Sequence, residues 1–229
     1  MKKSEEAKFT EKVNVISPVE AILVVIATFF LFLFLGAIVL LEFGTGPTLV
    51  FGELVILIVP LGYLMLKNID VRRYVGIDVK PKLILAGIIS GLALFLLDIV
   101  VSGAMTFIFG ASKAVEESNA LIVSLTSSTQ GLILVVVSLS LAGICEEFAF
   151  RGFLQNTINR KYSFLPSAII AAVAFGIFHF DPQFVYTFSA MITGLALGYI
   201  YHRWNSYVVS ATAHTTVNII VLTVLLLVR

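Results

Sequence analysis

The sequence predicts an all-α, polytopic bundle of membrane-spanning helices. Of its 229 residues, 59% are hydrophobic and 13% are charged, whereas a soluble domain carries roughly 25% charged residues. The mean hydropathy is +1.04. This composition excludes an ordinary soluble globule. It also excludes disordered, collagen-like and coiled-coil chains, because these need polar, Gly-X-Y or heptad-charged sequences.

Apolar stretches of about 18 residues predict seven spans, with an undetected eighth helix as the alternative. Short breaks with turn residues separate them, such as Gly44–Pro47 and Trp204–Ser206. The first stretch is longer than the apolar region of a signal peptide and no cleavage site follows, so we expect it to stay as a span. The expected spans are Pro18–Leu41, Thr48–Leu66, Leu83–Phe109, Gly131–Ile158, Phe164–Phe180, Phe184–Tyr201 and Tyr207–Val228.

Basic residues gather in alternate loops, and this asymmetry sets the orientation by the positive-inside rule. The opposite loops hold Lys113, with Arg229 at the C-terminus. With seven spans, the N-terminus lies in the cytoplasm and the C-terminus outside. The basic residues on the cytoplasmic side are Lys2, Lys3, Lys8, Lys12, Lys67, Arg72, Arg73, Lys80, Lys82, Arg160, Lys161 and Arg203.

The domain organisation is simple, because we find no repeat, linker or low-complexity tract. We therefore expect residues 1–229 to form a single integral membrane domain. The compact chain without a targeting tail favours a prokaryotic cell membrane. The formal net charge of +1 gives no indication of a nucleic-acid partner.

Ionisable and amide side chains lie inside three of the last four spans. A charged group at the centre of a membrane helix costs about 2.5–3.5 kcal/mol on insertion scales, so each one is a functional hypothesis. The first three spans have little comparable apart from Asp98, Glu53 and Glu42. The residues in the later spans are Glu146, Glu147 and Arg151 in span four, His179 at the end of span five, and His214 and Asn218 in span seven.

The spacing of these residues indicates which of them share a helix face. Residues four apart share a helix face, which places Glu147 beneath Arg151 and His214 beside Asn218. Glu146 is rotated by about 100° from Glu147, so it can face a cavity while Glu147 pairs with the arginine. We expect Glu146 to be the chemical carboxylate and Glu147 with Arg151 to be its buried support. The reverse assignment fits the same spacing.

The residue types point to hydrolysis of an amide bond within the membrane. A carboxylate and a histidine that reach one water molecule, here Glu146 and His179, can take its proton. A second histidine and an amide on one helix face, His214 and Asn218, can donate hydrogen bonds to the oxygen that becomes negative. We expect no metal or other cofactor. A zinc ion held by His179, His214 and Glu146 is the alternative, since such a trio suffices for catalytic zinc.

Three motifs occur in order within the spans: Glu-Glu-x-x-x-Arg at Glu146–Arg151, Phe-x-x-x-His at Phe175–His179, and His-x-x-x-Asn at His214–Asn218. At these residues the chain resembles the CPBP intramembrane proteases. This family is also called the CAAX protease and bacteriocin-processing, or Abi, family, and it includes the Ras-converting CAAX endopeptidases. The resemblance covers about residues 121–224.

The resemblance implies a glutamate-dependent intramembrane endopeptidase. Glu146 with His179 would activate water, and His214 with Asn218 would stabilise the oxyanion, while Phe175 walls the cavity. The implied partners are membrane lipid and a membrane-anchored protein or peptide, prenylated in CAAX-type processing and cleaved near its C-terminus. A non-catalytic binding protein on the same fold, such as a bacteriocin-immunity or scaffold protein, is the alternative function. A transporter is disfavoured because inverted repeats and broken helices are missing.

Overall fold

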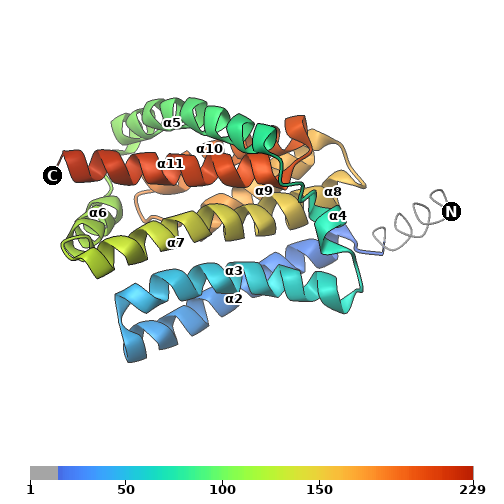
Figure 1. The fold of residues 1–229 in the computed structure, drawn as a ribbon, viewed down its shortest axis with the longest axis horizontal. Helices are drawn as coiled ribbons and strands as arrows, with labels where there is room; N and C mark the ends of the chain where they lie inside the picture. Colours follow the sequence, from blue (N-terminus) through green and yellow to red (C-terminus); the bar gives the residue numbers. More distant parts are fainter. Residues whose placement is uncertain (1–14, 229) are drawn as a thin grey trace.

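The computed structural model describes residues 15–228, and every regular element in that range is helical (Figure 1). The chain is a polytopic helical membrane protein, as the composition predicts. Lys2, Lys3, Lys8, Lys12 and Arg229, which entered the orientation argument, lie outside the described residues. The elements are α2 Pro18–Phe43, α3 Thr45–Leu66, α4 Val71–Val75, α5 Pro81–Phe109, α6 Lys113–Leu125, α7 Thr129–Glu147, η1 Phe148–Gln155, α8 Asn156–Asn159, α9 Phe164–Phe178, α10 Val185–Trp204 and α11 Tyr207–Leu227.

The helices are arranged around a central pair. α2 and α3 form a hairpin on one side of the molecule and α5 lies on the other, while α7 and α11 pack together between them and α9 and α10 lie behind (Figure 1). Half of the apolar window in the continuous helix Thr129–Asn159 is buried (50%), against 11% in α2. The helices that carry most of the expected site residues are therefore the core of the bundle.

Contacts at the helix ends define where the α2–α3 hairpin begins and turns. Ser17 and Glu20 form a reciprocal capping box at the start of α2, with Pro18 at the first helical position. Glu20 also contacts Lys67 at the end of α3, with 3.2 Å between Oε1 and Nζ. Gly44 joins the two helices with a φ of 78°, a value that glycine adopts without steric strain. These contacts fix where the hairpin begins and turns.

Three loops rich in basic residues meet at the end of the bundle where α4 lies. Asp70 caps α4 through the backbone N–H of Arg73. Asn156 of α8 donates a hydrogen bond to the carbonyl oxygen of Tyr74, at 2.6 Å. The guanidinium of Arg160 lies 4.6 Å from the centre of the Tyr74 ring. The backbone N–H of Tyr207 donates to Gly76, so the turn before α11 reaches the same end.

Five helices within the described residues are long and apolar enough to cross a membrane. They correspond to the expected spans one to four and seven, with ends that differ by a few residues. The helices at the expected fifth and sixth spans are also present, but α9 has 15 residues and α10 carries polar residues such as Thr187 and Thr193. The apolar pattern does not predict α4 and α6; α4 has five residues, and α6 buries none of its side chains.

The expected fourth span is continuous, but its second half is not a regular α-helix. Residues Phe148–Gln155 form a π-helical segment in which all eight residues are buried. A π-helix is wider than an α-helix because each bond closes a longer ring, and such segments are frequent at functional sites. Gly152 lies against Val75 of α4, where a larger residue would collide. The segment begins directly after Glu146 and Glu147.

Candidate active site

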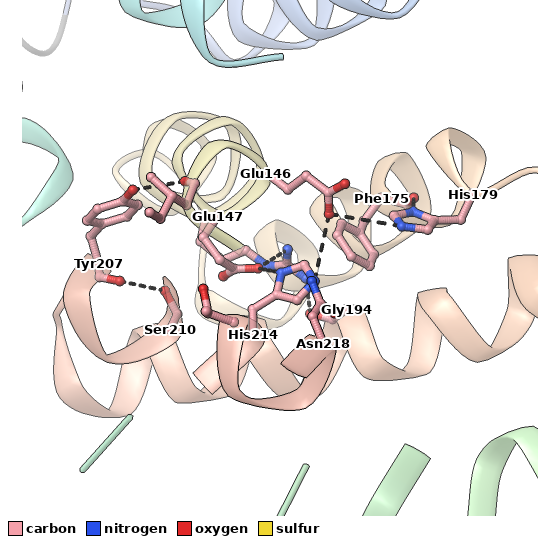
Figure 2. Close-up of polar contacts among 12 residues, drawn as sticks. Glu146, Glu147, Phe175, His179, Gly194, Tyr207, Ser210, His214 and Asn218 are labelled. Atoms are coloured by element: carbon pink, nitrogen blue, oxygen red, sulfur yellow. Dashed lines mark hydrogen bonds and ion pairs between the residues drawn. The ribbon is translucent and has the colours of Figure 1, made fainter. Parts of the chain in front are cut away.

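Glu146 lies in the last turn of α7 and points toward histidines of two other helices. Its Oε2 atom lies 4.0 Å from Nε2 of His179 and 3.8 Å from Nε2 of His214. Glu146 is 7% exposed, and Oε2 is buried without a hydrogen-bond partner among the described residues. These separations are too long for direct hydrogen bonds and suit a single bridging water molecule. Figure 2 shows Glu146 directed at His179 and Glu147 directed at His214.

The second ring nitrogen of each histidine is held by a group that only accepts hydrogen bonds. Nδ1 of His214 lies 3.1 Å from Oε1 of Glu147. Nδ1 of His179 lies 2.8 Å from the carbonyl oxygen of Phe175. A carbonyl and an ion-paired carboxylate accept, so both Nδ1 atoms must donate. In the neutral rings the lone pair is then on Nε2, the atom that faces Glu146.

Glu147 and Arg151 form the buried ion pair that their spacing predicts. Nη1 of Arg151 lies 2.6 Å from Oε1 of Glu147, and both side chains are fully buried. Nη2 donates to the carbonyl oxygen of Gly194, at 3.0 Å. The guanidinium also lies 4.4 Å from the ring centre of Phe175. Arg151 therefore connects the carboxylate that holds His214 to the aromatic ring beside His179.

Gln155 repeats the Arg151 contact one turn later. Its Nε2 donates to the carbonyl oxygen of Gly198, at 2.9 Å, and Gln155 is 2% exposed. Arg151 and Gln155 are four residues apart, as are Gly194 and Gly198. The glycines leave room for this approach, because a Cβ atom on Gly198 would lie 2.6 Å from Oε1 of Gln155. The two side chains thus fasten η1 to the backbone of α10.

His179 owes its position to the early end of α9. The helix stops at Phe178, and His179 is its C-terminal cap. Thr187 of α10 donates its hydroxyl to the His179 carbonyl, at 3.2 Å. The buried Asp181 organises the following turn by accepting bonds from Ser112 (2.8 Å) and from the Tyr186 N–H (3.0 Å). Burial alone would raise the pKa of Asp181, but these hydrogen bonds outweigh it and lower the pKa.

Asn218 lies one turn beyond His214 on α11, as the spacing predicts (Figure 2). Its Nδ2 donates to the carbonyl oxygen of Leu139 on α7, at 3.1 Å. An amide nitrogen carries two hydrogens, so one remains for another acceptor. The contacts of the described residues thus bring together six of the expected side chains, and they hold Asn218 against α7. The six are Glu146, Glu147, Arg151, Phe175, His179 and His214.

Two contributors were absent from the sequence analysis as site residues. Gln155 was detectable, because it follows Arg151 by the same four-residue spacing that joins Arg151 to Glu147. Tyr186, whose ring centre lies 5.2 Å from that of His179, gave no comparable signal. It lies on a different helix from His179, and only the turn between α9 and α10 brings the two rings together.

The zinc alternative depends on how close together the candidate ligands lie. Within residues 15–228, no three His, Cys, Asp or Glu side chains lie close enough together to hold a metal ion as placed. Binding through His179, His214 and Glu146 would therefore require these side chains to move closer to one another. The fixed Nδ1 atoms would still leave both Nε2 atoms available as ligands.

Comparison with known proteins supplies one match. The sequence model of the family described as type II CAAX prenyl endopeptidase, Rce1-like, matches residues 128–220. This segment begins at the cap of α7 and ends within α11, so it contains all three motifs and leaves out α2, α3 and α5. No curated protein and no solved structure matches the chain.

Proposed function

Because residues 128–220 form a domain of the Rce1-like type II CAAX prenyl endopeptidase family, we propose that the chain is an intramembrane endopeptidase. It cleaves a peptide bond near the membrane-embedded or prenylated C-terminus of its substrate. The observation that carries the proposal is the position of Glu146. Its buried Oε2 has no hydrogen-bond partner within residues 15–228 and faces Nε2 atoms of His214 and His179 at 3.8 and 4.0 Å.

In the proposed reaction, water lies between Glu146 and His179. Glu146 accepts one proton from the water, and His179 orients it by accepting the other hydrogen at Nε2. The water oxygen then attacks the carbonyl carbon of the scissile bond. When the carbon–nitrogen bond breaks, protonated Glu146 returns its proton to the leaving amine. The second hydrogen of the water stays on the new carboxyl group, so the protons and charges of the reaction balance.

His214 and Asn218 would stabilise the oxyanion of the tetrahedral intermediate. The Nδ1 hydrogen of His214 is used by Glu147, so Nε2 donates only when the ring is doubly protonated. Before the reaction the carboxylate of Glu146, 3.8 Å from Nε2, balances the positive charge of that form, and in the tetrahedral intermediate the oxyanion does so. Asn218 would donate the hydrogen that Leu139 does not use. Glu147 and Arg151 act in this scheme by holding His214.

The proposed membrane topology has seven spans with the N-terminus in the cytoplasm. It includes α9 and α10, which lie in the bundle beside η1 and α5. In support, Arg72, Arg73 and Asn205 line one surface pocket, and Arg160 stacks on Tyr74 at the same end of the molecule. Their common location agrees with a single basic, cytoplasmic end.

The test is cleavage of defined peptides by the detergent-purified protein, with products identified by mass spectrometry. Matched peptides ending in a CAAX-type sequence are offered with and without a prenyl group on the cysteine. We expect one new carboxyl terminus at a single position, and faster cleavage of the prenylated peptide. If folded protein binds the peptides without cutting them, the non-catalytic binding function is supported instead.

A further inference from the structure

Asp181, two residues after His179, is a buried carboxylate that has no chemical step in the proposed reaction. It is 1% exposed. Its Oδ1 atom accepts hydrogen bonds from the hydroxyl of Ser112 at 2.8 Å and from the backbone N–H of Gln183 at 3.1 Å. Its Oδ2 atom accepts from the backbone N–H of Tyr186, at 3.0 Å. One side chain therefore holds both halves of the turn that follows His179.

A first series of contacts leads from Asp181 to the main chain of His179. The backbone N–H of Asp181 donates to the hydroxyl of Thr187, at 2.9 Å, and this hydroxyl donates in turn to the carbonyl oxygen of His179, at 3.2 Å. α9 ends at Phe178, so the carbonyl of His179 lies beyond the regular hydrogen bonds of that helix. Thr187 is 4% exposed, which leaves solvent little access to replace its hydroxyl.

A second series of contacts leads from Asp181 to the ring of His179. Asp181 fixes the backbone of Tyr186, and the Tyr186 ring packs edge-on against the imidazole, with 5.2 Å between the ring centres and 78° between the planes. The ring centre of Phe175 lies 4.5 Å from the same imidazole. Edge-to-face contacts between aromatic rings are favourable. One ring from α9 and one from α10 thus restrict the side chain of His179.

The turn between α9 and α10 also contains a strained residue. Phe184 has a φ of 62°, a value that is unusual for a bulky side chain. Its N–H donates to the carbonyl oxygen of Asp181, at 2.8 Å. Such a backbone conformation persists where the surrounding contacts over-determine it, and it is frequent at functional sites. Asp181 supplies these contacts through its carbonyl and through both carboxylate oxygens.

Ser112 attaches this turn to a distant part of the chain. It directly precedes α6 and is 4% exposed. Its hydroxyl donates to Asp181 and accepts from the backbone N–H of Val115, at 3.2 Å. Ser112 lies before residues 128–220, the segment that the family model matches. The chain therefore supports the turn beside His179 from outside that segment.

From these contacts we infer that Asp181 is a positioning residue for His179. It holds the main chain of His179 through Thr187 and the imidazole through Tyr186, and so keeps Nε2 at 4.0 Å from Oε2 of Glu146. The inference deepens the proposed endopeptidase function and rests on it. Misplacing a reacting group by about 1 Å can cost about 10²-fold in rate, so loss of these contacts should slow the chemical step.

The first experiment changes the hydroxyl that joins Asp181 to His179. Thr187→Val removes the hydroxyl, and Thr187→Ser keeps it. For the folded protein acting on the prenylated peptide, we expect Thr187→Val to lower kcat by about tenfold. KM should stay within about twofold, because His179 acts on water rather than on the bound peptide. Thr187→Ser should restore kcat to within about threefold of wild type.

The control is Thr223→Val on α11. The Thr223 hydroxyl is exposed and donates to the carbonyl of Ile219 in its own helix, so this variant makes the same chemical change away from the turn. It should keep the wild-type kcat and KM.

The second experiment changes Asp181 and its anchor. In Asp181→Asn the amide nitrogen takes the place of one carboxylate oxygen, so it must face a backbone N–H group, either of Gln183 or of Tyr186. We expect a loss of kcat of at least about tenfold with KM nearly level. Ser112→Ala should change kcat in the same direction. If Asp181→Asn does not fold, Ser112→Ala and the two Thr187 variants provide the decision.

The outcomes separate positioning from a purely structural role. A lower melting temperature of Thr187→Val with wild-type kcat in its folded fraction would overturn the inference. A loss of kcat that Thr187→Ser does not restore would overturn it as well. In both cases cleavage by wild type leaves the endopeptidase function standing. If wild type cleaves none of the peptides, the endopeptidase function is refuted and the inference with it.

Discussion

His214 donates a hydrogen bond from Nδ1 to Oε1 of Glu147 across 3.1 Å, and the same oxygen accepts from Arg151. One carboxylate oxygen thus joins α11 to the π-helical segment that follows α7. The two neighbouring glutamates therefore have different roles. Glu147 is used for holding other side chains, while Oε2 of Glu146 accepts no hydrogen bond from the described residues.

Arg151→Ala should destabilise the fold. The change leaves Glu147 charged, buried and without its cation, which typically costs about 3–5 kcal/mol. We expect a lower yield of folded protein and a lower melting temperature in detergent. Lys161→Ala is the control, because Lys161 is exposed and a surface change of this kind stays within about 0.5 kcal/mol. Equal melting temperatures for the two variants would contradict the structural role of Arg151.

Asn218→Ala should lower kcat by about 10²–10³ and leave KM nearly level, because an oxyanion donor acts in the transition state. His214→Ala should do likewise, and the two losses should be less than additive because both donors serve one oxygen. The hydrogen bond to Leu139 is the basis of an alternative, purely structural role for Asn218. A purely structural Asn218 would lower the melting temperature and spare the kcat of the folded fraction.

Metal analysis tests the zinc alternative. We expect purified wild type to contain no stoichiometric zinc and to keep its rate after treatment with a chelator. A zinc site would behave differently: His214→Ala would lose metal, Asn218→Ala would retain it, and chelation would inactivate wild type reversibly. That pattern would refute the oxyanion role of His214, because its Nε2 would be a ligand.

Gly198→Ala should disturb the fastening of η1 to α10. The new methyl group would lie 2.6 Å from Oε1 of Gln155, and overpacking of this kind typically costs about 1–3 kcal/mol. We expect a lower melting temperature and reduced turnover. Gly62→Ala is the matched control, since a Cβ there meets no atom of the described part of the chain within 4 Å and alanine favours a helix. If both variants behave alike, the Gln155 contact is unimportant.

The membrane fold was largely predictable because it depends on local sequence. Apolar stretches and helix breaks identify α2, α3, α5, the continuous helix Thr129–Asn159, α9, α10 and α11 to within a few residues. α4 and α6 were missed because neither is a long apolar stretch. The π-helical segment was missed as well, because its hydrogen-bond pattern leaves no clear mark on hydropathy.

The candidate site was predictable where contacts lie within one helix. The Glu147–Arg151 pair follows from a four-residue spacing, and the motif residues lie in spans where polar groups are costly. Contacts between helices were not accessible in this way. The carbonyl of Leu139 as the partner of Asn218, and the position of Tyr186 beside His179, depend on how α7, α9, α10 and α11 pack.

Glu146→Gln is the most direct test of the claim that this carboxylate activates water. Glutamine keeps the size of the side chain and removes the base. We expect the variant to fold with wild-type yield and melting temperature, and to cleave the prenylated peptide at least about 10²-fold more slowly. Wild-type turnover by folded Glu146→Gln would contradict the proposed mechanism.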